Sequence, residues 1–174
     1  MISTHWHDGS SIAPHVPALA ALLTDAVESG ASVGYTLPID GPAIAAYWAG
    51  VAAAVAADTL WLVTAHDATG ALVGTAQIAP AAKANGRHRA EVQKVLVHSS
   101  VRRRGIGLQL MQAVHAHAQA RGRTLLLLDT RSNDAGEQLY RRCGWHKYGE
   151  VPGYAYSPDG TLQGTSFYSI DLTQ

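Results

Sequence analysis

The sequence predicts an α+β fold in one domain over residues 1–174, with a mixed, mostly antiparallel sheet that has a central parallel strand pair and flanking helices. Three observations lead to this class. A chain of 174 residues can bury one sizeable core and is too short for two ordinary domains. Its first half contains a hairpin pattern, which gives antiparallel strands. A strand, a helix and a strand then follow in order, and this unit needs a right-handed crossover between parallel strands.

Helices and the hairpin occupy the first half of the chain. Residues 14–29 place apolar side chains at the i, i+3, i+4, i+7 spacing of an amphipathic helix, and Gly30 is positioned to end it. A second helix is expected over about 40–57, with a proline near its first turn. The β-rich runs 60–65 and 71–78 are joined by a short turn that contains glycine, which predicts the antiparallel hairpin.

The strand, helix and strand of the crossover follow in the second half. Alternation over 89–98 predicts a strand, and helical spacing returns over 105–121. The continuous apolar run 125–128 is typical of a strand covered on both faces. Asn133 or Asp134 can cap a short helix, and two strands should close the fold. These last elements are expected over 134–144, 145–150 and 165–172.

Charges are divided unevenly along the chain, although the net charge is zero. All 13 Lys and Arg residues lie between Lys83 and Lys147, where four acids accompany them, so this segment has a net charge of +9. Such a block favours a local anionic ligand, unless folding intersperses the bases with acids from both ends of the chain. Nucleic acid is not the expected ligand, because few aromatic residues and no recognised nucleic-acid motif accompany the bases.

Composition excludes further classes of protein. The single Cys143 rules out an internal disulfide and a cysteine-based zinc cluster, and we expect it to be a packing residue in a cytoplasmic protein. The nine histidines show no i, i+4 pairing, so no metal site is expected. His98 ends a strand, where it is either solvent-exposed or a secondary proton acceptor. No basic-then-apolar leader opens the sequence and no stretch favours a membrane span, so we expect no membrane partner.

The segment Arg102-Arg103-Arg104-Gly105-Ile106-Gly107 lies between a predicted strand and a predicted helix. Its two glycines would let a ligand approach the backbone, and the helix would offer unpaired N–H groups to an anion. The three arginines add charge that could meet further phosphates. A nucleoside-triphosphate P-loop is excluded because no Gly-Lys-Ser/Thr follows, and Leu110 replaces the third glycine of a dinucleotide motif. By spacing alone, the segment could also be a tight connection.

The context of this segment resembles the Gcn5-related N-acetyltransferase (GNAT) family. The similar pattern comprises VLV at 95–97, RRRGIG at 102–107, LLLLD at 125–129, Asn133, Tyr140 and Gly144-Trp145. The resemblance implies acetyl-CoA as co-substrate, with the coenzyme A pyrophosphate held by the glycine loop. One departure is Arg103, where many members carry glycine. The positions implied to bind the cofactor are Val95, Leu96, Val97, Arg102, Arg103, Arg104, Gly105, Ile106, Gly107, Leu108 and Asn133.

Further segments resemble the tabtoxin-resistance acetyltransferases within that family. They are ASVGY at 31–35, RAEVQK at 89–94, LDT at 128–130, EVPGY at 150–154 and SPDG at 157–160. This resemblance implies a β-lactam amino acid toxin as the acceptor and a role in resistance. We expect the acceptor pocket to form from the first two helices and two loops, with Ser32, Tyr35 and Tyr154 binding the substrate.

Acetyl transfer to an amine needs a base, because only the neutral amine attacks a thioester. Glu91 on the incoming strand and Asp129 at the carboxyl end of the next strand are the candidates, since ligands bind beyond such strand ends. The alternatives are an exposed strand carboxylate for Glu91 and a turn or cap residue for Asp129.

Two more groups should complete the site. The resemblance implies oxyanion donors in the strand backbone near Leu96 and Val97, and places Tyr140 beside the leaving sulfur. Asn133 and Tyr140 are seven residues apart, so both would face the cofactor if they shared a helix. The alternative for Tyr140 is a packing role. We therefore expect an N-acetyltransferase for a primary amine of a small molecule. The alternatives are another small amine or antibiotic as acceptor, or a non-catalytic acyl-CoA sensor, and the oligomeric state is open.

Overall fold

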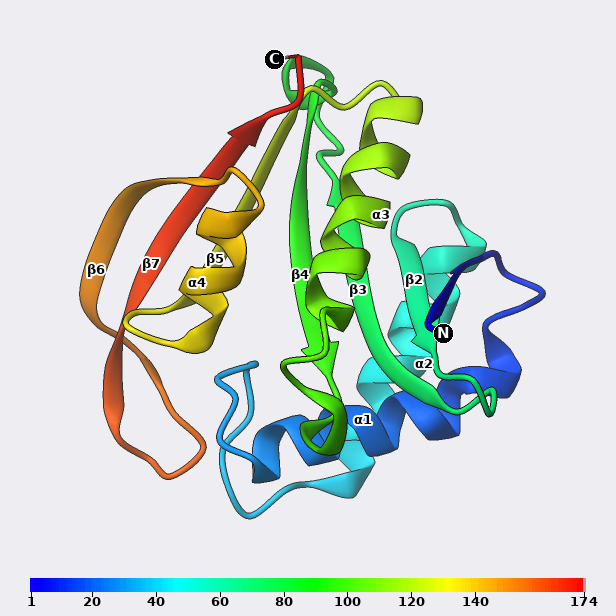
Figure 1. The fold of residues 1–174 in the computed structure, drawn as a ribbon, viewed down its shortest axis with the longest axis vertical. Helices are drawn as coiled ribbons and strands as arrows, with labels where there is room; N and C mark the ends of the chain where they lie inside the picture. Colours follow the sequence, from blue (N-terminus) through cyan, green and yellow to red (C-terminus); the bar gives the residue numbers. More distant parts are fainter. Residues whose placement is uncertain (174) are drawn as a thin grey trace.

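The computed structural model, which describes residues 1–173, has the expected α+β architecture (Figure 1). One sheet of seven strands runs in the order β1-β2-β3-β4-β5-β7-β6, and β4 and β5 are its parallel pair. The strands are β1 (Ser3–His7), β2 (Trp61–His66), β3 (Leu72–Pro80), β4 (Arg89–Val97), β5 (Leu125–Arg131), β6 (His146–Tyr156) and β7 (Leu162–Asp171). The helices are α1 (Val16–Glu28), α2 (Gly41–Ala56), α3 (Ile106–Ala120) and α4 (Ala135–Arg142), with short 3₁₀ turns at Ala13–His15, Ala84–Gly86 and Ser99–Val101.

Two separate hydrophobic cores form on the two faces of the sheet. On one face α3 buries Leu110 and Val114 against the central strands. On the other face α1 and α2 pack around Trp48, which is fully buried. Strand β2 is buried along its whole length because it contributes to both cores, Val63 to the first and Leu62 to the second. Alternate strand residues therefore face opposite cores, as the period of two requires.

The strand β1 was not expected from the sequence. It pairs antiparallel with β2, with Ser3 opposite His66 and His7 opposite Leu62. Trp6 is its one apolar residue and packs against the α3 core, and Ser3, Thr4 and His5 are exposed, so no apolar alternation reveals a strand. Strand β6 also begins one residue later and extends six residues beyond the expected 145–150. Among the described residues, no helix has both the length and the apolarity to cross a membrane.

The parallel pair β4 and β5 is joined over three residue pairs only, from Arg89–Leu125 to Glu91–Leu127. Beyond these pairs the two strands diverge, and Figure 1 shows them meeting at one end of the sheet and separating toward the other. Within residues 1–173, the β5-facing backbone groups of β4 beyond Glu91 consequently have no strand partner. We call the space between the diverging strands the β4–β5 gap.

Candidate active site

The turn between β4 and α3, with the first residues of the helix, has the backbone shape of an anion-binding loop. We call residues 98–107 the anion loop. Gly105 is the N-cap of α3 and has a φ of +82°, a conformation that favours glycine. Arg103, the departure from the family pattern, also has a positive φ, +64°. The first turn of α3 adds backbone N–H groups without helical acceptors and the positive end of the helix dipole. The turn can therefore hold a phosphate group through its backbone.

The two glycines of this loop have different roles. A Cβ at Gly105 would meet no atom within 4 Å, so the backbone here is open to a ligand. A Cβ at Gly107 would lie 3.0 Å from Cδ2 of Leu139, so this glycine allows α4 to pack close to α3. The expectation that both glycines admit a ligand is thus supported by the open space at Gly105, whereas Gly107 has a packing reason.

The three consecutive arginines are not equivalent. Arg102 turns back onto the protein, where its Nε donates to the carbonyl of Val97 at 3.0 Å and its Nη2 to Oγ of Ser29 at 2.7 Å. Arg103 and Arg104 are exposed, and no hydrogen bond or ion pair is found for either side chain in the described part of the chain. Two of the three guanidinium groups therefore stay available for a polyanion, and Arg102 has a structural contact to α1.

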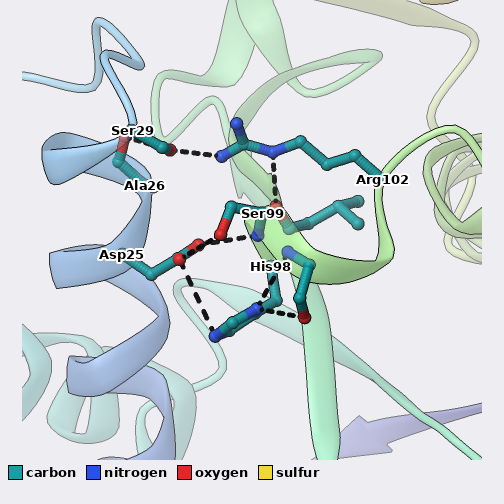
Figure 2. Close-up of polar contacts among 8 residues, drawn as sticks. Asp25, Ala26, Ser29, His98, Ser99 and Arg102 are labelled. Atoms are coloured by element: carbon teal, nitrogen blue, oxygen red, sulfur yellow. Dashed lines mark hydrogen bonds and ion pairs between the residues drawn. The ribbon is translucent and has the colours of Figure 1, made fainter.

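Helix α1 also holds the start of this loop through Asp25 (Figure 2). Its carboxylate accepts hydrogen bonds from the backbone N–H of Ser99 at 2.8 Å and from Oγ of Ser99 at 2.5 Å, and Nε2 of His98 lies 3.7 Å away. Burial opposes ionisation of Asp25, but the bonds from Ser99 and the charges of His98 and Arg102 outweigh it and lower its pKa. Nε2 of His98 thus faces α1 and its Nδ1 lies 2.9 Å from Oγ of Ser100, while the role of a secondary proton acceptor stays a prediction.

The two candidate bases lie on the face of the sheet that α1 and α2 cover. Ala90 and Leu128 belong to the α3 core, so Glu91 and Asp129, their neighbours in strands of period two, point to the opposite face. Glu91 is exposed and accepts a hydrogen bond of 3.1 Å from Nε2 of Gln93. The pKa of Asp129 is raised, chiefly by burial of its surroundings, although its residue surface is open to solvent. We call this side of the sheet the acceptor face.

Lys94, for which the sequence predicts no role, lies on β4 between Glu91 and the anion loop. Its φ of +48° marks a β-bulge, where the register between β3 and β4 shifts. Its Nζ lies 5.4 Å from the ring centre of Tyr47 on α2. Two consecutive polar residues, Gln93 and Lys94, interrupt the alternation of this strand and are the signal that could have located the bulge.

Tyr140 on α4 is buried, with 7% of its surface exposed. Its ring centre lies 6.1 Å from those of Trp145 and Tyr168, so it is part of the α3 core. Burial, and secondly the negative charge of Asp129, raise the pKa of its hydroxyl, which therefore stays protonated and able to donate. The contacts of Tyr140 are those of a packing residue, and its role as a proton donor stays a prediction.

Asn133 does not share a helix with Tyr140, so the argument from two helical turns is wrong. Helix α4 begins at Ala135, and Asp134 caps it by accepting a hydrogen bond from the Ala135 N–H. Asn133 precedes the helix with a φ of +62°, a conformation that asparagine tolerates. The role of Asn133 in cofactor binding stays a prediction, without the helical spacing that suggested it.

The loop after α1 joins the turn between β6 and β7, as expected for an acceptor pocket. The backbone N–H of Leu37 donates to the carbonyl of Pro158 at 2.9 Å, and Nη1 of Arg131 donates to the carbonyl of Gly30 at 3.0 Å. Tyr35 lies edge-on to Tyr47, with ring centres 6.3 Å apart. Ser32 is in the same loop and is partly buried, without a side-chain hydrogen bond within residues 1–173.

Tyr154 reaches the neighbourhood of the bases through one intermediate residue. It lies edge-on to Phe167 at 5.4 Å between ring centres. Phe167 on β7 is the direct partner of Asp129 on β5, and directly opposite residues of antiparallel strands share a face. Tyr154 and Phe167 therefore form an aromatic border of the acceptor face. Phe167 was not singled out in the sequence, because its position opposite Asp129 depends on the strand register.

A pocket of about 360 Å³ opens on the same face between α2 and the strands β3 and β4. Tyr47, Gln77 and Gln93 line its polar side, and apolar residues of α2 line the rest. The hydroxyl of Tyr47 donates to Oε1 of Gln77 at 3.0 Å, while the buried Nε2 of Gln77 has no hydrogen-bond partner within the described residues. Gln93, which lines the pocket, is also the hydrogen-bond partner of Glu91, so the pocket adjoins one candidate base.

The single cysteine lies outside the acceptor face. Burial raises the pKa of the Cys143 thiol, which is the opposite of an activated nucleophile, and the residue packs against the α3 core. No group of three or more His, Cys, Asp or Glu side chains suited to a metal ion occurs in the described part of the chain.

Comparison with a family model decides the assignment. Residues 57–147 match the model of the acetyltransferase (GNAT) domain, a span that includes β2 to α4, the anion loop and both candidate bases. The chain belongs to the GNAT acetyltransferase family. The anion loop, with open backbone at Gly105, two unpaired arginines and a helix N-terminus, fits the phosphates of acetyl-CoA as the co-substrate of this GNAT domain.

Solved structures share the whole fold of this GNAT acetyltransferase. An N-acetyltransferase from Staphylococcus aureus Mu50 superposes with a TM-score of 0.80 at 20% identity, covering 99% of each chain. The structure of yncA from Salmonella typhimurium with its cofactor acetyl-CoA has a TM-score of 0.78 at 16% identity, covering 100% of this chain and 95% of that one. A ribosomal-protein-alanine N-acetyltransferase from Brucella melitensis has a TM-score of 0.77 at 22% identity, covering 97% and 99%. At these identities the likeness extends to the fold alone.

Proposed function

We propose that this protein transfers the acetyl group of acetyl-CoA directly to a primary amine of a small molecule. The observation that carries the proposal is the β4–β5 gap, which has an anion loop at its end and an ionisable carboxylate, Asp129, on the acceptor face. The buried hydroxyl of Tyr140 lies within electrostatic range of that carboxylate. An anion site, a base and a proton donor are the groups that amine acetylation requires.

The cofactor side of the gap has the groups to bind and orient acetyl-CoA, which supplies the activated acetyl thioester. Arg103, Arg104 and the N-terminus of α3 would hold the phosphates. The backbone of β4 around Leu96 and Val97, which has no strand partner on the β5 side, would accept the extended arm as an added strand and donate to the carbonyl oxygen of the acetyl group. The arm would then take the place that β5 leaves empty.

The acceptor face would prepare the amine. Asp129 removes a proton from the ammonium form, directly or through a water molecule, and its raised pKa brings its basicity closer to that task. Glu91, exposed and held by Gln93, orients the amine or relays its proton to solvent. From the other side of the sheet, Tyr140 donates its proton to the leaving sulfur. Burial raises the pKa of its hydroxyl, so the group is protonated at neutral pH and is a weaker acid than an exposed tyrosine.

We propose a small molecule as the acceptor, and a tabtoxin-like β-lactam amino acid is one candidate. The support for that candidate is the set of five sequence segments described above, which includes the loop at 31–35 and the turn at 157–160. The alternative acceptors are other small amines or antibiotics. A cytoplasmic location also stays an expectation, since it derives from the cysteine content alone.

Thiol release in the presence of a panel of amines tests the function. An enzyme should release coenzyme A only when acetyl-CoA and a suitable amine are both present, and the product should gain the mass of one acetyl group. A non-catalytic sensor, the second candidate, would bind acetyl-CoA with similar affinity and release no thiol. The sensor is less well supported, because binding alone needs neither the raised pKa of Asp129 nor the position of Tyr140.

A further inference from the structure

Lys94 is directed onto the acceptor face by a distortion of β4. In a regular strand its side chain would lie on the α3 side of the sheet, like that of Val92, and opposite to that of Gln93. The bulge and the φ of +48° instead bring its Nζ to Tyr47 of α2 and to within 3.9 Å of the Cβ position of Gly34. A positive φ on a lysine carries a cost in free energy, and such strain is concentrated at functional sites. The distortion therefore places the ammonium of Lys94 on the acceptor face at a cost in backbone strain.

The ammonium of Lys94 is half-buried and has no anionic partner. Within residues 1–173 it forms no hydrogen bond and no ion pair, whereas Arg121, Arg131, Arg141 and Lys147 each pair with a carboxylate. Tyr47 offers the face of its ring, because Nζ lies over that ring at 5.4 Å from its centre and the hydroxyl donates to Gln77 instead. A partly desolvated cation of this kind is stabilised when an anion binds beside it.

Two carboxylates of the site lie near Lys94 without touching it. Asp129 and Glu91 act on its charge, but neither comes within the 4.0 Å of an ion pair. Burial lowers the pKa of Lys94 more than these two charges raise it. The acceptor face thus presents separated charges of opposite sign, two carboxylates suited to an ammonium and one ammonium suited to a carboxylate.

We propose that Lys94 binds a carboxylate of the acceptor, so that the substrate class is a small amino acid that carries this group close to the amine to be acetylated. The proposal rests on the proposed function and deepens it. The amine would lie at Asp129 and the carboxylate at Lys94, beside the rings of Tyr47 and Tyr35. Lys94 acts as a residue that determines specificity and takes no part in proton transfer.

Matched acceptors test this role. Each amino acid of a panel is compared with its carboxamide, which keeps the amine and the shape and loses the negative charge. The wild-type protein should favour the acid over the amide by roughly 10- to 100-fold in kcat/KM, the range for a charged hydrogen bond. Lys94→Met should remove this preference through the KM of the acceptor, with the KM of acetyl-CoA unchanged. Lys94→Arg should restore part of it, and Lys83→Met, at an exposed lysine outside the site, is the matched control.

A binding measurement separates this inference from the proposed function. The melting temperature is followed with coenzyme A and each acceptor, so that no turnover is required. Stabilisation by amino acids but not by their amides, lost in Lys94→Met and kept in Lys83→Met, supports carboxylate binding by Lys94. This holds even if no amine is acetylated, because the absence of acetylation would overturn the proposed function alone. Equal stabilisation and equal rates with acids and amides, or an unchanged preference in Lys94→Met, would overturn the role of Lys94 and leave acetyl transfer intact.

Discussion

Asp25 on α1 binds Ser99 at both of its carboxylate oxygens, with Oδ2 2.8 Å from the backbone nitrogen and Oδ1 2.5 Å from Oγ. Helix α1, which leads into the loop at 31–35, thereby also holds the turn at Ser99 with which the anion loop begins. Four residues further along, Ser29 at the C-cap of this helix accepts a hydrogen bond from Arg102. The two substrate sites share one support, α1, although they come from segments more than 70 residues apart in the sequence.

Replacement of Asp25 by alanine should weaken acetyl-CoA binding and lower stability. The variant leaves the N–H of Ser99 without its partner, at a cost of about 1–3 kcal/mol. Calorimetric titration with acetyl-CoA and a thermal melt measure the two effects. Asp67→Ala, at an exposed hairpin turn with similar local hydrogen bonds, is the control and should change stability without changing affinity. Unaltered affinity in Asp25→Ala would show that α1 does not position the loop.

Gly105→Val should reduce acetyl-CoA affinity far more than Arg103→Ala. A β-branched residue is disfavoured at a φ of +82° and would fill the open space beside the loop. Affinity measured by calorimetry checks this, with Gly70→Val as the control for a positive φ in a turn distant from the site. Equal losses in the Gly105 and Arg103 variants would contradict a backbone cradle. Binding should also weaken with rising salt, since Arg103 and Arg104 are exposed.

Asp129→Asn should lower turnover at neutral pH and leave acetyl-CoA affinity nearly unchanged, and Glu91→Gln should do the same. Because the pKa of Asp129 is raised, wild-type kcat/KM should begin to fall, as pH decreases, at a higher pH than an ordinary aspartate would give. The deficit of both variants should shrink at high pH, where solvent has deprotonated the amine. A pH–rate profile of all three proteins tests the assignment, and full activity of both variants at every pH would make the carboxylates structural.

Tyr140→Phe should bind acetyl-CoA normally and lose roughly 10²- to 10⁴-fold in turnover, the range for one acid–base group. The ring and its contacts to Trp145 and Tyr168 are kept, so the hydroxyl alone is tested. Tyr168→Phe, in the same core, is the matched control. Turnover near the wild-type rate, accompanied by a lower melting temperature, would assign Tyr140 to packing.

A histidine cluster at the β1 end of the sheet should make stability depend on pH. His7 and His15 lie 4.6 Å apart between ring centres, and His66 lies 5.4 Å from His15. Burial first, and the neighbouring histidines second, lower the pKa of His7 and of His15 below 6.5. The unfolded chain therefore binds more protons than the folded one as the pH falls through 6.5, so stability is greatest above this pH and decreases below it.

Thermal melts between pH 5 and 8 test this dependence. The melting temperature should fall toward pH 5, and the fall should be smaller when both His7 and His15 are replaced by glutamine. His146→Gln, at an exposed position of β6, should leave the slope as it is. A pH dependence that is the same in the double variant would exclude the cluster as its source.

The fold followed from the sequence wherever burial imposes a period on it. Helix α3 and strand β5 carry apolar residues at regular intervals because their inner faces are buried, so their positions agree with the sequence prediction within a few residues. Strand β1 has one apolar residue, Trp6, which packs against the α3 core, and a single apolar position imposes no period from which the strand could be identified. The crossover gave the parallel pair, but no local pattern shows that the pairing stops after Glu91.

The candidate site was predicted where chemistry and spacing coincide, and missed where register decides. Glu91, Asp129 and the anion loop could be chosen because a residue type and a strand end mark them. Arg102 could not be distinguished from Arg103, since only the folded position of Ser29 takes its guanidinium away from the loop. Lys94 depends on a bulge, a single-residue irregularity that a period of two does not encode.

The short contact between β4 and β5 divides the sheet into two parts, called wedges here, that are hydrogen-bonded to each other only near one end. One wedge contains β1 to β4 and the other contains β5 to β7, and three residue pairs tie them together at one end. At the other end two hydrogen bonds connect the segments on either side of the β4–β5 gap, from the N–H of Leu37 to the carbonyl of Pro158 and from Nη1 of Arg131 to the carbonyl of Gly30. The width of the β4–β5 gap is therefore set at its two ends rather than along its length.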